Sequence, residues 1–198
     1  AYRHVFIIHY PDEEREAARP LRQAPCYDRM KSLGAVFGQK FGWERPNFFA
    51  TDGMKQEDDW SFRRSNWFKA MEKECKNVKE NVGLLDMTAF AKCRIKGPKA
   101  EEFLDNLVAN KLPKKIGRIN LCHALNTKGG VHSEFTIMRE TEDSFYLVSA
   151  GAFQRLDHDW ILKWMPNDGS VQFENLTNST GVLVVSGPKA RDLMKKVS

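Results

Sequence analysis

The sequence predicts an α+β protein built from β-α-β-β units, and three observations carry that prediction. The residues Gly97-Pro98-Lys99-Ala100 recur ninety residues later as Gly187-Pro188-Lys189-Ala190. A β-like run precedes each copy (91–96 and 182–186), and an amphipathic helix pattern follows each. Two runs typical of strands, 132–139 and 145–150, lie between the copies. A motif repeated with the same strand–turn–helix context indicates an internal structural repeat.

Composition and charge limit the kinds of protein that the chain can be. Its 198 residues suit one sizeable domain or one domain with an appendage, and 41% hydrophobic with 29% charged residues is ordinary for a soluble globular protein. No apolar run approaches the roughly 20 residues of a membrane helix. The net charge of +5 is too modest to indicate a nucleic-acid binder. We therefore expect neither a membrane nor a nucleic acid as partner.

The four cysteines are widely spaced, and no two form a C-x-x-C pair. This spacing argues against structural zinc and against a disulfide framework. We expect buried thiols in a reducing compartment, which fits a bacterial cytoplasm or a mitochondrial matrix. The first residues are typical neither of a signal peptide nor of a transit sequence.

The first 64 residues are expected to precede the compact domain. Residues 1–50 are rich in arginine, proline and aromatic residues, and the prolines keep regular elements short. A short helix is predicted from about Cys26 to Leu33, ending at Gly34. Residues 51–64 are polar and indicate a linker, so we expect the domain to occupy 65–198.

Helices and strands of that domain follow from the spacing of apolar residues. Ser65 or Asn66 is expected to cap a helix that Gly83 stops. A strand near 90–96 and a helix opened by Gly97-Pro98 come next. A further helix is expected after 150, ended by Pro166. In the first and the last of these helices, apolar residues at helical spacing form a stripe that we expect to be buried. The stripe consists of Phe68, Met71, Cys75, Val78 and Val82 in the first helix, and of Phe153, Leu156, Trp160, Ile161 and Trp164 in the last. The second copy of the repeat stops inside its helix at Ser198, so we expect the domain to be truncated.

One strand carries candidate chemistry. Alternation along 131–137 places His132, Glu134 and Thr136 on one face, following the Gly129-Gly130 loop. Glu134 could accept hydrogen bonds from a ligand or stabilise a developing cation, and His132 could pair with it as acid and base. The alternative is a polar strand face in contact with water. Two such residues are too few for a metal site, so none is expected.

Two other features have a structural interpretation, and one of them also has a functional interpretation. His123 lies one strand earlier and is interpreted as a partly buried structural histidine. A basic cluster (Lys111, Lys114, Lys115 and Arg118) is either a solvated loop or a group that steers an anionic ligand.

Several segments resemble the dimethylglycine and sarcosine dehydrogenase family, and from about residue 65 the chain is also similar to the aminomethyltransferase (T-protein) of the glycine-cleavage system. The segments that carry the resemblance are 34–46 (GAVFGQKFGWERP), 62–68 (FRRSNWF), 83–92 (GLLDMTAFAK) and 121–130 (LCHALNTKGG). The resemblance implies ferredoxin-like β-α-β-β units of a T-protein folate-binding fold, incomplete and preceded by a linker. Residues 1–50 would then be the end of a flavin-oxidoreductase domain and its junction.

The same resemblance implies a function in two stages. In this family a flavin oxidises an N-methylated amino acid, and tetrahydrofolate captures the one-carbon unit as 5,10-methylenetetrahydrofolate. FAD would bind a domain upstream of this chain. The resemblance also implies a non-catalytic alternative, because the pyruvate dehydrogenase phosphatase regulatory subunit shares the layout. Neither the N-methyl amine nor the oligomeric state follows from the sequence.

Site residues are carried over by position from the T-protein pattern Gly-Gly-x-x-Asp-Asp. Ser133 falls on the first acid and Glu134 on the second, one methylene longer, so Glu134 is expected to be the catalytic carboxylate. Leu121 and Val148 fall on apolar positions that line the folate cavity, although each could be ordinary core. Ala150 stands where T-proteins often place a polar asparagine, and further folate contacts of the family lie beyond Ser198. We therefore expect weak or absent folate binding by the chain alone.

Overall fold

A computed structural model describes residues 2–51 and 53–197, which divide into two compact units. One unit is continuous and spans 88–182, whereas the other combines 1–87 with 183–198. Among the described residues, no helix is long and apolar enough to cross a membrane.

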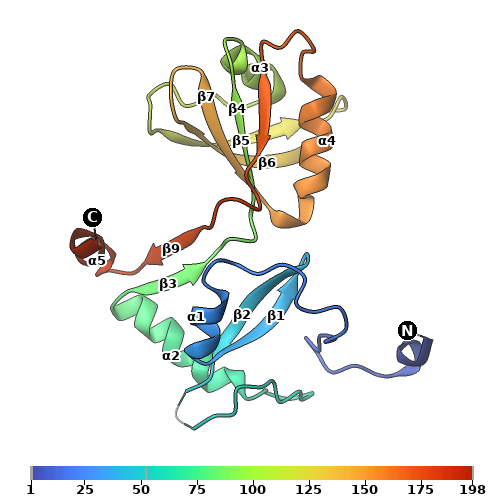
Figure 1. The fold of residues 1–198 in the computed structure, drawn as a ribbon, viewed down its shortest axis with the longest axis vertical. Helices are drawn as coiled ribbons and strands as arrows, with labels where there is room; N and C mark the ends of the chain where they lie inside the picture. The colour runs from blue at the N-terminus through green and yellow to red at the C-terminus, as the bar shows by residue number, and fades with distance from the viewer. Residues whose placement is uncertain (1, 52, 198) are drawn as a thin grey trace. The chain divides into compact units, whose positions relative to one another are not determined.

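The continuous unit contains one five-stranded antiparallel sheet with strand order β5-β6-β7-β4-β8 (Figure 1). Without β5, the order β6-β7-β4-β8 and the chain order β-α-β-β-α-β are those of a ferredoxin-like unit, as predicted. Its elements are β4 (Ala91–Lys96), α3 (Ala100–Leu107), β5 (Ile119–Leu125), β6 (Val131–Arg139), β7 (Ser144–Ser149), α4 (Gln154–Trp164, after the short 3-10 turn η2, Gly151–Phe153) and β8 (Gln172–Asn175).

The two helices of this unit cover one face of its sheet. Phe103 and Leu104 of α3 and Ile161 of α4 belong to the same buried cluster as Phe135 and Phe145 of the sheet. Successive side chains of a strand point to opposite faces. In β6, the residues between the buried ones therefore point to the face that the helices leave open.

The second unit contains two separate antiparallel strand pairs, β1 with β2 and β3 with β9 (Figure 1). Its elements are the 3-10 helix η1 (Tyr2–Phe6), α1 (Tyr27–Ser32), β1 (Ala35–Lys40), β2 (Trp43–Phe49), α2 (Trp67–Glu80), β3 (Gly83–Asp86), β9 (Leu183–Ser186) and α5 (Ala190–Val197). The predicted helix near 26–33 is present as α1. The β1–β2 hairpin was not predicted, because Pro46 lies within β2. A two-stranded hairpin tolerates this proline, which pairs with Phe37 next to a β-bulge.

The repeated Gly-Pro-Lys-Ala motif has the same local geometry in both copies. Gly97 and Gly187 have φ angles of 129° and 130°, a region that L side chains rarely adopt. In each copy the alanine N–H donates to the glycine carbonyl, at 2.9 Å for Ala100 and 3.0 Å for Ala190. The internal repeat predicted from four residues is therefore a repeat of structure.

The repeat also extends to segments that lack sequence similarity. Lys99 donates its backbone N–H to the carbonyl of Ser170 just before β8, and Lys189 donates to that of Asn81 just before β3. β8 pairs with β4 as β3 pairs with β9, and a helix precedes β8 (α4) and β3 (α2). In the second copy, the helix and strand that complete the unit thus come earlier in the chain than the motif itself.

Two predicted helices differ in detail from the structure. The side chain of Asn66 does not cap α2; it accepts the backbone N–H of Asp59 and donates to the carbonyl of Glu57. The predicted apolar stripe of α2 is largely exposed at Phe68, Cys75 and Val78, whereas Ala70 packs against Val36 and Phe48. In α4 the buried residues are Asp157 and Ile161, while Leu156 and Trp164, and Phe153 just before the helix, are exposed. The predicted stripe of the second helix is thus confirmed at Ile161, which is buried in the core, and at Trp160, which packs against it. Ala70 in α2 and Asp157 in α4 are contact positions that a search for apolar spacing does not find.

Candidate functional site

The three site residues predicted from the sequence lie on strands of one sheet. In the observed register Leu121 of β5 pairs with Thr136 of β6, and Thr136 pairs with Val148 of β7. Paired residues of antiparallel strands point to the same face, so Leu121, Thr136 and Val148 form one row across the open face. Glu134 precedes Thr136 by two positions and shares that face. The sequence predicted one face for His132, Glu134 and Thr136, and the register agrees for Glu134 and Thr136.

Exposure shows that this row is not part of the core. Leu121 is 52% exposed, and the side chain of Glu134 is 61% exposed. By contrast, the residues that alternate with Glu134 and Thr136 along β6 are buried: Ser133, Phe135 and Ile137. The alternative that Leu121 is an ordinary core residue does not apply within this unit.

Glu134 contacts a histidine on the neighbouring strand. Its Oε2 lies 3.0 Å from Nε2 of His123, which is the residue directly opposite it in the β5–β6 register. Asn110, from the segment after α3, accepts the backbone N–H of His123 at 3.0 Å through its Oδ1. Nδ1 of the His123 ring lies 3.3 Å from the same oxygen. His123 thus has a direct connection to the predicted carboxylate, which the sequence interpretation missed.

His132 does not form the acid–base pair with Glu134 that its spacing allowed. The register shifts between Ala124 and Leu125, so that His132 has no residue opposite it in β5. Its ring stacks on Trp160 of α4, with ring centroids 4.0 Å apart and planes inclined by 29°. A β-bulge re-aims the side chains next to it, and strict alternation cannot predict where one occurs.

A pocket of about 370 Å³ adjoins Glu134. Its walls come from β6, β7, α4 and the segments beside them. The lining residues are Phe90, Val131, His132, Ser133, Glu134, Thr136, Val148, Ser149, Ala150, Phe153 and Asp157. Two of the three predicted site residues, Glu134 and Val148, line this pocket, whereas Leu121 lies outside it at the other end of the row.

A second carboxylate is buried at the back of this pocket. Asp157 of α4 is 2% exposed and accepts hydrogen bonds from the hydroxyls of Ser133 at 2.6 Å and Ser149 at 2.5 Å. Ser133 is the residue that the sequence comparison predicts at the position of the first acid in the T-protein pattern. The structure therefore places an acid next to that position after all, but on a helix rather than on the strand.

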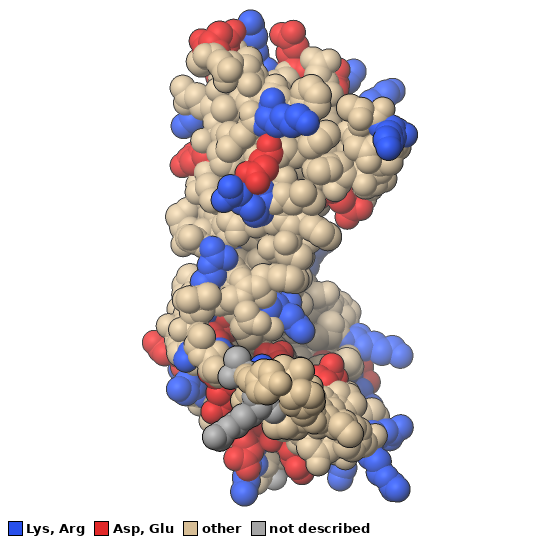
Figure 2. Space-filling model, turned by 90° about the vertical axis from the view of Figure 1, so that its right-hand side faces the viewer, with Lys and Arg blue, Asp and Glu red and all other residues tan. Residues whose placement is uncertain are grey.

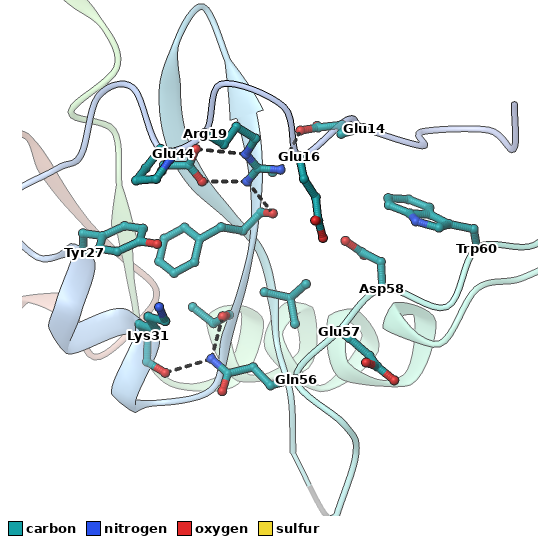
Figure 3. Close-up of a pocket in the computed structure, with 15 residues that line it drawn as sticks. Glu14, Glu16, Arg19, Tyr27, Lys31, Glu44, Gln56, Glu57, Asp58 and Trp60 are labelled. Carbon is teal, nitrogen blue, oxygen red and sulfur yellow. Dashed lines mark hydrogen bonds and ion pairs between the residues drawn. The ribbon is translucent and has the colours of Figure 1, made fainter. Parts of the chain in front are cut away.

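A larger cavity of about 710 Å³ lies in the other unit and has the opposite electrostatic character to that expected of a folate site (Figure 3). Five carboxylates line it against two cationic side chains, Arg19 and Lys31. These acids are Glu14, Glu16, Glu44, Glu57 and Asp58. Arg19 is held by Glu44 at 2.6 Å and by the carbonyl of Phe37 at 2.9 Å (Figure 3). Burial, and then the charge of Glu14, raises the pKa of Asp58. A wall of carboxylates repels an anionic group, so the charge of this cavity does not suit the anionic tail of a folate.

Charged side chains of both signs are interspersed on the face drawn in Figure 2. The four residues of the basic cluster lie in the segment between α3 and β5 and are all exposed. Lys111 directly follows Asn110, so the cluster begins next to the residue that contacts His123.

Comparison with known proteins identifies the family. The GCVT N-terminal domain family matches this chain over residues 26–198. The chain belongs to the GCVT N-terminal domain family. The fold agrees: the crystal structure of the glycine cleavage system aminomethyltransferase T from Bartonella henselae superimposes with a TM-score of 0.72 at 23% identity, covering 89% of this chain and 43% of that one.

Relatives of this GCVT-domain chain include much longer proteins. Dimethylglycine dehydrogenase of Rattus norvegicus is 35% identical over 193 residues, which are 97% of this chain and 22% of the relative. The pyruvate dehydrogenase phosphatase regulatory subunit of Mus musculus is 32% identical over 199 residues, which are 98% of this chain and 23% of that protein. The alpha subunit of sarcosine oxidase from Rhizobium meliloti (strain 1021) is 28% identical over 187 residues, which are 90% of this chain and 18% of the subunit. The chain thus spans about a fifth of the length of the relatives it matches.

These findings confirm the predicted resemblance and the α+β fold of the GCVT-domain chain. They also account for the likeness of the first 50 residues to dehydrogenases, because the similarity to dimethylglycine dehydrogenase covers nearly the whole chain.

Proposed function

We propose that this chain forms the tetrahydrofolate-binding part of a flavin- and folate-dependent demethylating dehydrogenase acting on dimethylglycine or sarcosine. One observation carries the proposal: Glu134 presents an accessible carboxylate beside a pocket of about 370 Å³, on the open face of a GCVT-type domain. The apolar residues Leu121 and Val148 lie in the adjacent row of the same face. A flat, partly apolar ligand that carries N–H donors fits such a combination.

The proposed chemistry assigns one task to this chain. When bound, FAD on another domain would oxidise the N-methyl amine, and tetrahydrofolate would accept the one-carbon unit. Glu134 accepts a hydrogen bond from a folate N–H and takes up the proton that the nitrogen loses as its new bond to carbon forms. Its negative charge also stabilises the cationic one-carbon donor. Leu121 and Val148 exclude water on either side of Thr136.

Other parts of the chain have proposed roles around that task. We assign residues 1–50 to the end of the flavin-oxidoreductase domain and its junction, 51–64 to a linker and 65–198 to the folate domain. The exposed basic cluster begins beside Asn110 and would attract the anionic glutamate tail of folate. Mitochondrial relatives and bacterial sarcosine oxidases support a mitochondrial matrix or bacterial cytoplasm as the location.

The proposal is tested by following the fate of the one-carbon unit. Glu134→Gln in the enzyme containing this chain should leave amine oxidation unchanged but divert the product from 5,10-methylenetetrahydrofolate to free formaldehyde. Both products are measured in the same reaction with dimethylglycine and with sarcosine. The control is Glu102→Gln, an exposed carboxylate on α3. An unchanged ratio of the two products in the Glu134 variant contradicts the proposal.

A regulatory function is the second candidate, because the phosphatase regulatory subunit is nearly as similar as the dehydrogenase. A protein of that kind would show no amine oxidation, and Glu134→Gln would not alter its effect on a phosphatase. Turnover of an N-methyl amine decides between the two functions.

The chain alone is expected to bind tetrahydrofolate weakly or not at all, because Glu134, Leu121 and Val148 form one open face. Titration calorimetry on the chain measures this directly. Micromolar affinity would show that this face and its pocket suffice.

A further inference from the structure

The pairing of His123 with Glu134 is fixed by the sheet rather than by the two side chains alone. The residues are directly opposite in the β5–β6 register, so both side chains point to the open face. Their Nε2 and Oε2 atoms lie 3.0 Å apart. The pair is adjacent to the row of Leu121 and Thr136, where the folate site is proposed.

Asn110 fixes the other edge of the imidazole. Its Oδ1 accepts the backbone N–H of His123 at 3.0 Å, which identifies that atom as the oxygen of the amide. The same oxygen lies 3.3 Å from the ring Nδ1. The segment carrying Asn110 is itself held to β5, since Ala109 donates its backbone N–H to the carbonyl of His123 at 2.9 Å. The ring therefore lies between two acceptors, both anchored by backbone hydrogen bonds.

This arrangement determines which ring nitrogen keeps a proton. The imidazolium satisfies both acceptors, because it carries N–H groups on both nitrogens. In the neutral ring the N–H lies on Nε2, because the carboxylate can only accept and its contact, at 3.0 Å, is shorter than the 3.3 Å contact to Asn110. Nε2–H thus donates to Oε2 of Glu134 in either form of the ring. Oε1 remains available to a ligand, in keeping with the side-chain exposure of 61% for Glu134 against 32% for His123.

We propose that His123 is a positioning residue for Glu134, and that Asn110 supports it. The inference rests on the proposed function of Glu134. A glutamate has one more rotatable bond than the aspartate of the T-protein pattern, so its carboxylate samples more positions when free. The hydrogen bond from His123 selects the one in which Oε1 faces the N–H group of the folate.

The test uses a mutant cycle in the enzyme containing this chain. His123→Leu replaces the imidazole by an apolar side chain of similar size that cannot donate. His123→Gln replaces the ring N–H donor by an amide N–H. We expect His123→Leu to raise the KM for tetrahydrofolate in the formation of 5,10-methylenetetrahydrofolate about tenfold, as for loss of one ordered side chain. His123→Gln should restore most of the affinity. In a Glu134→Gln background, His123→Leu should have no further effect, because the two residues act as a unit.

A structural measurement on the chain itself is independent of folate. The Nε2–H proton of His123 should give an imidazole N–H signal in a ¹⁵N-correlated NMR spectrum, and Glu134→Ala should abolish it through exchange with water. Unfolding midpoints of the variants show whether each one folds.

The outcomes separate this inference from the proposed function. If Glu134→Gln abolishes one-carbon capture but His123→Leu leaves the KM unchanged, or acts equally in both backgrounds, the positioning role is wrong and the proposed function stands. If Glu134→Gln leaves capture unchanged, both are wrong. Capture that depends on Glu134, with an effect of His123 only when Glu134 is present, supports both.

Discussion

The hydroxyl of Ser133 donates a 2.6 Å hydrogen bond to the buried carboxylate of Asp157 and so ties β6 to α4 one residue before Glu134. The other carboxylate oxygen accepts the hydroxyl of Ser149 at 2.5 Å, which ties β7 to the same point. The backbone that presents Glu134 is therefore held from behind by a helix, while the carboxylate itself stays exposed.

Replacing Asp157 should destabilise the continuous unit. Asp157→Ala leaves two buried hydroxyls without their acceptor, and such losses cost about 1–3 kcal/mol for each unsatisfied group. We expect the free energy of unfolding in urea to fall by about 2–4 kcal/mol. Asp159→Ala on the same helix removes only an exposed pair with Arg155 and should change it by less than about 0.5 kcal/mol. Equal effects of the two substitutions would contradict this role.

Arg139 should contribute to the stability of the sheet through contacts that only an arginine can make. Its guanidinium donates to the carbonyls of Pro113 at 2.8 Å and Glu142 at 2.7 Å, and it lies 4.7 Å over the ring of Phe145. Lysine cannot reproduce these separate directions. Arg139→Lys is therefore expected to lower the free energy of unfolding by about 2 kcal/mol. Arg155→Lys, at a site whose side chain is 89% exposed, is the matched control and should have almost no effect.

The glycines of the repeated motif should tolerate no side chain. A Cβ at Gly97 would overlap the carbonyl oxygen of Ser170, and its φ of 129° is strained for any other residue. We expect Gly97→Ala to cost about 3 kcal/mol or more, measured by thermal or urea unfolding. Gly169 also has a positive φ, of 77°, but a Cβ there meets nothing within 4 Å. Gly169→Ala should cost only about 1 kcal/mol for the backbone conformation. Similar losses at both sites would show that the overlap is relieved.

Stability should fall in alkaline solution because of buried thiols, and that of Cys93 provides a test. Burial, with a smaller effect of Asp157, raises the pKa of Cys93 from 9.0 to about 12. Between these values the unfolded chain has lost the proton while the folded chain keeps it, so rising pH favours unfolding. We expect the free energy of unfolding to decline above pH 9 by at most about 1.4 kcal/mol per pH unit. Urea titrations at pH 8 and pH 10 should show a smaller decline for Cys93→Ala. An identical decline in that variant would assign the effect to other groups.

Local sequence patterns predicted the strands and helices that depend on near neighbours. The strand before Gly97 and the helix after it were predictable, because Ala100, Phe103, Leu104 and Leu107 follow helical spacing and all are buried. The site was predictable only in part. Glu134 and Val148 came from resemblance, and the structure places them in one pocket.

What the sequence did not reveal depends on pairing between distant segments. The contact of His123 with Glu134 requires the β5–β6 register, and the stacking of His132 on Trp160 requires the bulge at the end of that register. Asp157 lies on a helix whose apolar pattern pointed to other residues as its buried face. β3 pairs with β9 although residues 88–182, the whole continuous unit, lie between the two strands in the sequence.

That last pairing also sets an order of assembly. During synthesis, all strands of the continuous unit leave the ribosome before β9 does, and the contacts of that unit are closed within 88–182. β3 emerges early but has no partner until 183–186 follow. Until then, the backbone N–H and C=O groups that β3 uses in that pairing have no strand to bond to. Because pairings of long sequence separation form slowly, the unpaired edge of β3 is a site at which a nascent chain can misassociate.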